Sequence, residues 1–276
     1  MLPPETIADL YRTACLTELD ALKVGNVHAY AAGHRMQVAD FVRSAEVSAP
    51  GLAMAGAGIG ARVLAGVAAT REAVGQNTNL GILLLCAPLA RAAETGRPLE
   101  EVLASVVSAD ARDVFAAIRL ASPGGLGRAE RYDVTTDAEP PPLSHAMAEA
   151  APRDRIARAY VTGFADITGI GLPALAEARA LGLDAAWTAS AVHLAYLAAV
   201  PDSHVLRKHG SEVADAVRES ASALRERIDW TARPVAQLLV HDAQLKDRGI
   251  NPGTSADFTV ATLFWRHLVD EGAAFV

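Results

Sequence analysis

The sequence predicts an all-α protein, because its composition and its apolar spacing both favour helices. Only 5% of the residues are aromatic, and β-branched runs of strand length are nearly absent. Alanine and leucine dominate instead, with apolar residues at the spacing of a helical face. No linker rich in proline, glycine or serine divides the chain. We therefore expect one multi-helix domain over residues 1–276, with polar groups gathered at helix ends.

The first helices are predicted from apolar faces and from residues that favour a helix start. Ile7–Ala21 places its apolar residues on one face and follows Pro3 and Pro4, which are tolerated before a helix. Glu18 lies on that apolar face, which is unusual for an acid that is merely solvated. The next helix is predicted to begin at Asp40, acting as its N-cap.

The later helices are predicted from apolar runs that glycine and proline punctuate. Leu80–Ala93 is one of them, and Gly96 ends it. Glu100–Leu120 follows, with Ser108–Asp113 as a polar stretch that interrupts it. Residues 122–142 lack periodicity and are predicted to pass over the surface. The helices beyond them are Asp154–Phe164, Pro173–Leu181, Asp184–Val200, Glu212–Trp230, Pro234–Lys246 and Ser255–Glu271.

The composition excludes several classes of protein. With 51% apolar and 21% charged residues, the chain is too hydrophobic to be disordered. A formal net charge of −7 disfavours a protein that binds duplex nucleic acid. Cys15 and Cys86 are too few for a disulfide framework or a four-thiolate zinc site, and they fit a reducing cytosol. The N-terminus shows no signal-peptide pattern, so we expect a cytoplasmic protein.

Three stretches resemble membrane spans or a dinucleotide-binding loop, neither of which we expect in this protein. Val47–Thr70 is rich in alanine and glycine but carries Pro50 and Arg62. Leu80–Ala90 is strongly apolar but shorter than the roughly 20 residues of a membrane span. Both are predicted as buried core helices. Gly56–Ala61 fits a loose dinucleotide-binding fingerprint, but no predicted strand precedes it, so we expect no Rossmann fold.

Five segments gather polar residues at helix ends, where a solvated face does not explain them. The first, Glu18–His34, holds a carboxylate, an amine, an amide and two imidazoles; its ordinary interpretation is a helix C-cap at Gly25 with polar surface groups. The second, Gly75–Gly81, precedes a very apolar helix. Either Thr78 or Asn79 would cap that helix, and its exposed N–H groups would also suit a phosphate.

The third segment, Pro201–Gly210, contains one acid, two imidazoles and two cations. Asp202 and His204 could hold a metal or position a hydroxyl group. Arg207 and Lys208 could hold phosphates, because cationic donors bind phosphate oxygens strongly. A solvated turn rarely combines these groups.

The fourth segment surrounds an Asn-Pro-Gly turn. Either Thr254 or Ser255 would cap the helix that follows, with Asp257 in its first turn. Capping explains Asp257, and a role as metal ligand stays open. The fifth segment, Gly124–Val134, allows a close approach of backbone, and Arg128 could add charge to a ligand site. A surface turn explains the fifth segment equally well.

In chain order, these segments resemble the motifs of the triphosphoribosyl-dephospho-CoA synthase family. The chain departs from the family at Asn79-Leu80, where the family has His-Lys, and at His204, where it has Asn. At these positions the chain resembles a divergent branch of the family, which is found near genes for methanopterin- and methanofuran-type one-carbon cofactors. The residues that carry the resemblance are Thr17–Asp20 with Lys23 and Gly25, Gly33-His34, Asp40-Phe41 with Ser44-Ala45, Gly75, Asn77-Thr78 and Gly81, Asp202–Val205, and Asn251–Asp257.

The resemblance implies a glycosyl transfer that serves prosthetic-group synthesis. The family joins ATP, through C1′ of its ribose, to a hydroxyl of dephospho-CoA and releases adenine. Departure of adenine builds oxocarbenium charge that carboxylates stabilise, and the acceptor hydroxyl needs a base. A triphosphate needs Mg²⁺, which takes oxygen ligands. We expect small-molecule substrates, namely ATP and dephospho-CoA or another cofactor precursor, and no nucleic acid or membrane as partner; a homo-oligomer stays open.

These chemical needs assign roles to residues. The expected catalytic residues are Glu18, Asp202, His34 and His204. The expected nucleotide-binding residues are Lys23, Asn26, Asn77, Thr78, Asn79, Arg128, Arg207, Lys208, His209 and Ser255. The expected Mg²⁺ ligands are Asp40 and Asp257. Three alternatives stay open: a transferase of the same fold with an acceptor from one-carbon cofactor synthesis, a nucleotide-binding protein without turnover, and a purely structural all-α protein.

Overall fold

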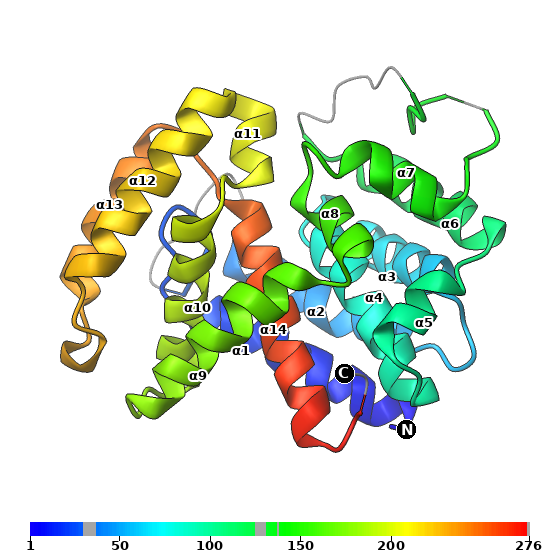
Figure 1. Cartoon of the computed structure of the whole chain (residues 1–276), viewed down its shortest axis with the longest axis horizontal. Coiled ribbons are helices and arrows are strands. Elements are labelled where there is room, and N and C mark those ends of the chain that lie inside the picture. The colour runs from blue at the N-terminus through cyan, green and yellow to red at the C-terminus, as the bar shows by residue number, and fades with distance from the viewer. Residues whose placement is uncertain (30–36, 125–130, 137, 275–276) are drawn as a thin grey trace. The chain divides into compact units, whose positions relative to one another are not determined.

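Helices form the regular structure of this chain. The computed structural model describes residues 1–29, 37–124, 131–136 and 138–274, and no strand occurs among them (Figure 1). The predicted all-α class is therefore confirmed. The helices are α1 (Pro4–Asp20), α2 (Val38–Leu52), α3 (Ile59–Val74), α4 (Leu80–Thr95), α5 (Leu99–Ala104), α6 (Ser108–Ala121), α7 (Leu143–Ala150), α8 (Arg155–Thr162), η1 (Ile167–Gly171), α9 (Leu172–Ala180), α10 (Ala185–Ala199), α11 (Ser203–His209), α12 (Ser211–Arg227), η2 (Trp230–Ala232), α13 (Val235–Asp247) and α14 (Gly253–Asp270).

The chain forms two compact units. Unit 1 comprises Met1–Ala14, Asp40–Phe164 and Phe264–Val276. Unit 2 comprises Cys15–Ala39 and Ala165–Leu263. Helices α1 and α14 each contribute to both units. The first, third and fourth predicted polar segments belong to unit 2, and the second and fifth belong to unit 1.

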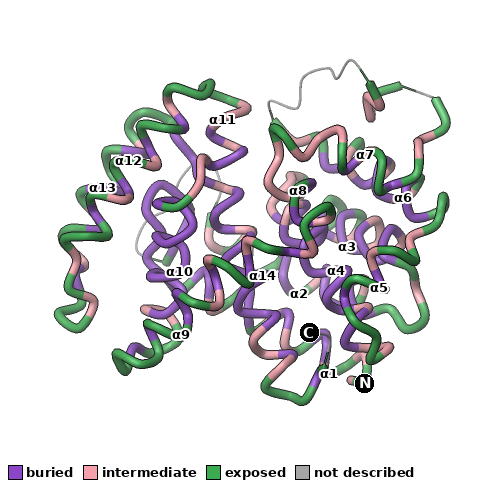
Figure 2. Tube along the Cα trace, in the orientation of Figure 1, coloured by how far each residue is buried: buried purple, intermediate pink, exposed green. Residues whose placement is uncertain are grey.

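Unit 1 has its core around α4, which packs against α3, α5, α6 and α8. Leu83, Leu85 and Leu89 of α4 are fully buried, and Figure 2 shows this helix as buried along most of its length. This confirms the predicted core helix at Leu80–Ala90. Cys86 lies buried in the same core, and Cys15 of unit 2 is likewise buried.

The glycines of Gly56–Ala61 serve helix packing in unit 1. Asp110 of α6 accepts a hydrogen bond of 2.8 Å from the backbone N–H of Gly60, at the first turn of α3. A Cβ atom on Gly58 would lie 2.5 Å from the Asp110 carboxylate, and one on Gly60 would collide with the Asp110 backbone. The amino terminus of α3 is thus capped by a protein carboxylate. The resemblance to a nucleotide fingerprint has a packing explanation.

Several predicted helix boundaries in unit 1 are wrong. Asp40 is not an N-cap, because α2 begins at Val38 and Asp40 lies in its first turn. Glu100–Leu120 is two helices, since the chain leaves the helix after Ala104, and Ser108–Asp113 opens α6. Asp110 closes a capping box there by accepting from the Val107 N–H at 3.0 Å, which favours a new helix start. Helices α7 and α11 were not predicted.

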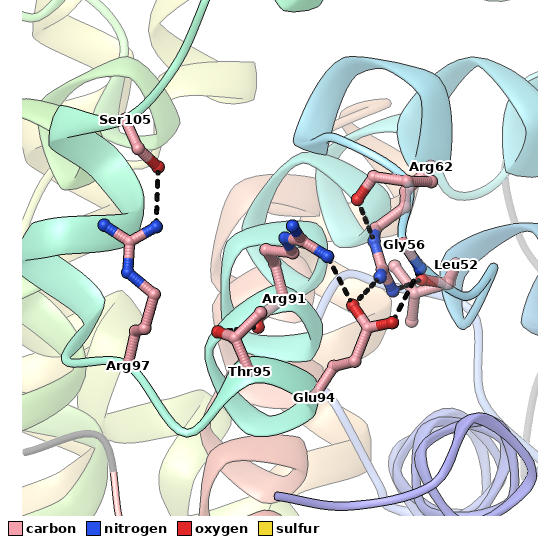
Figure 3. Close-up of polar contacts among 9 residues, drawn as sticks. Leu52, Gly56, Arg62, Arg91, Glu94, Thr95, Arg97 and Ser105 are labelled. Atoms are coloured by element: carbon pink, nitrogen blue, oxygen red, sulfur yellow. Dashed lines mark hydrogen bonds and ion pairs between the residues drawn. The ribbon is translucent and has the colours of Figure 1, made fainter.

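A buried ion pair holds the turn between α2 and α3 (Figure 3). Arg62 is fully buried and pairs with Glu94 of α4. The Arg62 guanidinium also donates to the Leu52 carbonyl at 2.7 Å. This carbonyl lies at the end of α2, where backbone acceptors have no partner within the helix. Glu94 in turn accepts from the Gly56 N–H at 2.7 Å and from Arg91 at 2.8 Å. The break that divides Val47–Thr70 into two helices is therefore fixed by charge-assisted hydrogen bonds.

Replacing Glu94 by alanine is expected to lower the free energy of unfolding by about 3 kcal/mol, because Arg62 would keep a buried charge without its partner. Urea denaturation monitored by circular dichroism measures this change. Glu101→Ala is the control, since Glu101 forms only an exposed pair with Arg97 and should cost less than about 1 kcal/mol. Equal losses in the two variants would contradict the structural role assigned to Glu94.

Unit 2 is built around α10, which packs against α9, η1 and α12. Leu194 and Leu197 of α10 are buried with Leu238 and Leu245 of α13 in one hydrophobic cluster. Figure 2 shows that α12 and α13 keep exposed faces on their other sides. In the described part of the chain, no single helix has the length and hydropathy of a membrane span; α8 and the η1–α9 stretch meet both criteria only when taken together.

Candidate functional site

The first polar segment forms a buried cluster in unit 2. Helix α1 ends at Asp20, earlier than the predicted end near Gly25, and the chain from residue 21 to residue 28 remains buried. Gly25 has a φ of +80° in this stretch, and a Cβ atom there would lie 2.8 Å from Pro252. Glycine is thus required both by the backbone conformation and by the close approach of the Asn-Pro-Gly turn.

Glu18 and Lys23 form an ion pair inside this cluster. Their side chains are only 6% and 1% exposed. The Lys23 ammonium also donates to the Asn26 side-chain carbonyl at 3.3 Å, and Asn26 donates to Asn251 at 2.8 Å. We call these four residues the Lys23 cluster. The structure therefore brings the first and fourth polar segments together, and the ordinary interpretation of the first as polar surface groups is wrong.

Burial sets the protonation behaviour of the Lys23 cluster. It raises the pKa of the Glu18 carboxyl, and the nearby Lys23 charge opposes that shift. Burial likewise lowers the pKa of the Lys23 ammonium, which Glu18 and Asp257 oppose. A carboxylate with a raised pKa and an amine with a lowered one exchange protons more easily than solvated groups do.

A second polar group, which the sequence did not reveal, lies beside this cluster. Asp242 of α13 accepts from the Gly25 N–H at 2.8 Å and from Lys246 at 3.0 Å, and it lies 3.4 Å from His28 Nε2. Burial raises the pKa of Asp242, but these donors outweigh it and the pKa falls below its ordinary value. A signal was available, because Asp242 shares a helical face with the apolar Leu238 and Leu245.

His193 is the other residue that the sequence analysis missed. It lies within the apolar helix α10, is 1% exposed, and its Nε2 atom is 3.4 Å from the Val24 carbonyl. Its Nδ1 atom is buried and has no hydrogen-bond partner among the described residues. Burial, with the nearby Lys23 charge, lowers the pKa of His193 to about 3. The signal was a histidine inside a run of small apolar residues.

The unfolding free energy is expected to fall as the pH drops below 6.5, because unfolded His193 takes up a proton that the folded state excludes. Between pH 6 and pH 4 the loss from this group reaches up to about 1.4 kcal/mol per pH unit, and it ends near the folded pKa of about 3. Urea denaturation at several pH values measures the slope. His193→Gln should make the slope shallower, whereas His209→Gln, at an exposed histidine, should not; identical slopes in all three proteins would refute this prediction.

Asp202 joins the amino ends of two helices in unit 2. One carboxylate oxygen accepts from the backbone N–H groups of His204 at 2.9 Å and Val205 at 3.1 Å, at the start of α11. The other accepts from the Ser255 N–H at 2.7 Å and from its hydroxyl at 2.9 Å, in the first turn of α14. Burial raises the pKa of Asp202, and these donors oppose the shift. The third and fourth segments thus meet at this carboxylate.

The predicted cap of α14 is therefore wrong in its identity. Thr254 and Ser255 lie inside the helix, which begins at Gly253, and the capping oxygen comes from Asp202. The Thr254 hydroxyl instead accepts from the His204 N–H at 3.2 Å. Gly253 leaves room for the His204 ring, since a Cβ atom there would lie 2.6 Å from His204 Nδ1.

The cations of the third segment lie on α11. Arg207 is partly buried, and Lys208 and His209 are exposed at the carboxyl end of the helix. In the first segment His34, and in the fifth Arg128, lie outside the described residues. Asp257 is partly buried on α14, one turn beyond Gly253.

The second segment forms a polar centre in unit 1. Asn79 is buried and donates to Ser48 at 3.1 Å and to Thr70 at 3.0 Å, so it anchors the loop. Asn79 occupies the N-cap position of α4, as predicted, but its side chain makes no capping hydrogen bond, and Asn77 accepts the Leu80 N–H at 3.1 Å instead. Near the same loop the Thr78 and Ser44 hydroxyls lie 2.5 Å apart, and Gln76 donates to Asp40 at 3.0 Å.

The chain matches one protein-family model over most of its length. The model of the family described as CitG, ATP:dephospho-CoA triphosphoribosyl transferase, matches residues 4–274. The chain belongs to this family. No curated protein and no solved structure matches the chain. The matched residues include both units, and the CitG description places the chain among transferases.

The CitG description names ATP as a substrate, and ATP commonly binds to proteins together with Mg²⁺. The described residues contain no group of three or more His, Cys, Asp or Glu side chains that could hold a metal. Mg²⁺ in nucleotide sites commonly uses one or two carboxylates together with phosphates and water. Asp40 in unit 1 and Asp257 in unit 2 are each a partly buried carboxylate.

Proposed function

We propose that this protein transfers the triphosphoribosyl group of ATP to a hydroxyl of dephospho-CoA and releases adenine. The family match supports the reaction class. The observation that carries the proposal within the chain is the buried Glu18–Lys23 pair. Lys23 binds one oxygen of Glu18, and the described residues donate no hydrogen bond to the other, so that oxygen is available to a substrate hydroxyl.

In this proposal Glu18 is the general base. The acceptor oxygen forms a bond to C1′ of the ribose while the bond from C1′ to the adenine nitrogen breaks. The hydroxyl proton passes to Glu18, whose raised pKa makes it a stronger base than a solvated carboxylate. Adenine leaves with the electron pair of the broken bond and takes up a proton, for which His204 and His34 are the proposed donors. The charge that develops at C1′ is stabilised by carboxylates near the reacting carbon.

Asp202 is proposed to act as a positioning residue for this reaction. Its oxygens already accept four hydrogen bonds from the protein, so they are occupied by protein donors and not by a substrate. By tying α11 to α14 it places the His204 N–H against the Thr254 hydroxyl. Ser255, which donates to Asp202, keeps its proposed role as a nucleotide contact.

The phosphates are proposed to bind cationic and N–H donors. The proposed phosphate and nucleotide contacts in unit 2 are Lys23, Asn26, Arg207, Lys208 and His209, and those in unit 1 are Asn77, Thr78, Asn79 and Arg128. Asp257 in unit 2 and Asp40 in unit 1 are each proposed as a protein ligand for Mg²⁺, which would supply charge neutralisation to the triphosphate. Asp257 already acts electrostatically on Lys23, so both groups would lie near the same phosphate charge.

The reaction is tested by incubating the purified protein with ATP, Mg²⁺ and dephospho-CoA and measuring free adenine by chromatography. We expect adenine only when dephospho-CoA is present. ATP binding that depends on Mg²⁺, without adenine release, would contradict this acceptor and favour acceptors from one-carbon cofactor synthesis or a protein without turnover. Absence of both signals would contradict the transferase proposal itself.

A further inference from the structure

A tight turn carries Lys23 at its first position and Asn26 at its last. The Asn26 N–H donates to the Lys23 carbonyl at 3.1 Å and closes the turn, in which Gly25 has a φ of +80°. We call residues 23–26 the Lys23 turn. It supplies two members of the Lys23 cluster, because the Lys23 ammonium binds Glu18 and donates to Asn26 at 3.3 Å. The conformation of the Lys23 turn therefore decides where the ammonium lies relative to Glu18.

Helix α13 holds the Lys23 turn through Asp242. One oxygen of Asp242 accepts from the Gly25 N–H at 2.8 Å. The Leu245 side chain, about one helical turn further along α13, packs so closely against Gly25 that a Cβ atom there would lie 2.9 Å from Leu245 Cδ1. The Asp242 side chain is only 4% exposed, so little water competes for the Gly25 N–H. The turn is thus fixed to a helix that lies far along the chain.

Asp242 is an ionised acceptor in this contact. Its other oxygen accepts from Lys246 at 3.0 Å, and the oxygen that binds Gly25 lies 3.4 Å from His28 Nε2. Burial raises the pKa of the Asp242 carboxyl, but these donors outweigh it and the pKa falls below its ordinary value. A carboxylate accepts stronger hydrogen bonds than a neutral carbonyl does, so the Gly25 N–H is held firmly.

We propose that Asp242 is a positioning residue for the transfer reaction. By binding the Gly25 N–H it fixes the Lys23 turn and thereby holds the Lys23 ammonium against Glu18. This inference rests on the proposed function, which makes Glu18 the base. Asp242 exchanges no proton in the reaction. Its effect is on geometry, and misplacing a catalytic group by about 1 Å can lower a rate about a hundredfold.

Two double variants isolate the contact with Gly25. Asp242→Asn, combined with Lys246→Met, retains a carbonyl oxygen that accepts from the Gly25 N–H. Asp242→Ala, combined with Lys246→Met, removes that oxygen. Lys246 is replaced in both proteins because its ammonium and the asparagine amide would otherwise face each other as two donors. The two proteins therefore differ only in the side chain at position 242.

Two measurements are made on each protein. The rate of adenine release at saturating ATP and dephospho-CoA is divided by the folded fraction, which urea denaturation gives. Hydrogen–deuterium exchange followed by mass spectrometry measures how firmly residues 21–28 are held, and residues 80–90 of unit 1 serve as the internal reference.

The Asp242→Asn protein should keep kcat within about threefold of the wild-type value, because a neutral acceptor holds the turn only somewhat less tightly. The Asp242→Ala protein should lose at least about tenfold in kcat. Residues 21–28 should exchange faster in the Asp242→Ala protein, whereas the reference residues should not.

A role in stability alone would lower the folded fraction but leave the kcat of the folded molecules unchanged. An Asp242→Ala protein with the kcat of the Asp242→Asn protein would therefore overturn the inference, even if its urea midpoint falls. Equal losses of kcat in the two proteins would overturn it as well, because the acceptor for the Gly25 N–H would not be their cause.

Failure of the proposed function would give a different result. If the wild-type protein releases no adenine, the transfer reaction is rejected, and hydrogen exchange alone judges Asp242. Faster exchange of residues 21–28 in the Asp242→Ala protein, but not in the Asp242→Asn protein, would support its hold on the Lys23 turn. Equal exchange in the two proteins would overturn that hold.

Discussion

Glu18→Gln is expected to reduce the rate of adenine release at least about a hundredfold, because the variant cannot take the proton of the acceptor hydroxyl. The amide carbonyl can still accept from Lys23, and the lowered pKa of that amine allows it to become neutral. The variant should therefore fold. Adenine release at saturating ATP and dephospho-CoA measures the effect.

Glu177→Gln is the matched control for this prediction. Glu177 is an exposed acid in the same unit and pairs only with the surface residue Arg225. Its turnover should equal that of the wild-type protein. A Glu18→Gln protein that keeps near wild-type turnover would remove Glu18 from the proposed mechanism, whereas loss of the fold in the urea titration would show that its role is structural.

Asp202→Ala is expected to lower the free energy of unfolding by about 4 kcal/mol, because two helices lose their caps and buried N–H groups lose their hydrogen-bond acceptor. Urea denaturation followed by circular dichroism measures the change.

Asp184→Ala serves as the comparison for Asp202. Asp184 caps only α10, by accepting from the Trp187 N–H at 3.0 Å, and its side chain is 58% exposed. Removing it should cost about 1 kcal/mol. A loss in Asp202→Ala no larger than this would contradict the double cap. Adenine release by the folded fraction of Asp202→Ala also distinguishes a positioning role from a direct one.

The burial of Glu18 could be predicted from sequence because a helix has a known periodicity. Its position on the apolar face of Ile7–Ala21 indicated a buried acid, and the structure confirms it. Asp242 carried a similar signal on α13, but its meaning depended on a partner. Nothing local identifies Gly25 and His28, more than two hundred residues away in the chain, as the groups that face it.

Helix caps show the same limit more sharply. Ser255, Thr254 and Asn79 all have side chains that favour an N-cap, and local preference predicted them as caps. The backbone N–H groups at those helix starts are satisfied by Asp202 and Asn77 instead. A helix is capped by whichever oxygen accepts the exposed N–H groups of its first turn. When that oxygen belongs to a residue distant in sequence, the residue preferences at the helix start do not predict it.

By itself, the sequence of this protein determined the all-α class, most of the helices, the family motifs and the buried Glu18. Those features depend on periodicity, composition and short-range order, all of which are written along the chain. Tertiary structure alone decided that Asn26 meets Asn251, that Asp202 joins two helices, and that His193 lies buried against the Val24 carbonyl. The physical reason is that buried polar groups must find partners in space, and the pairs that satisfy them need not be close in sequence.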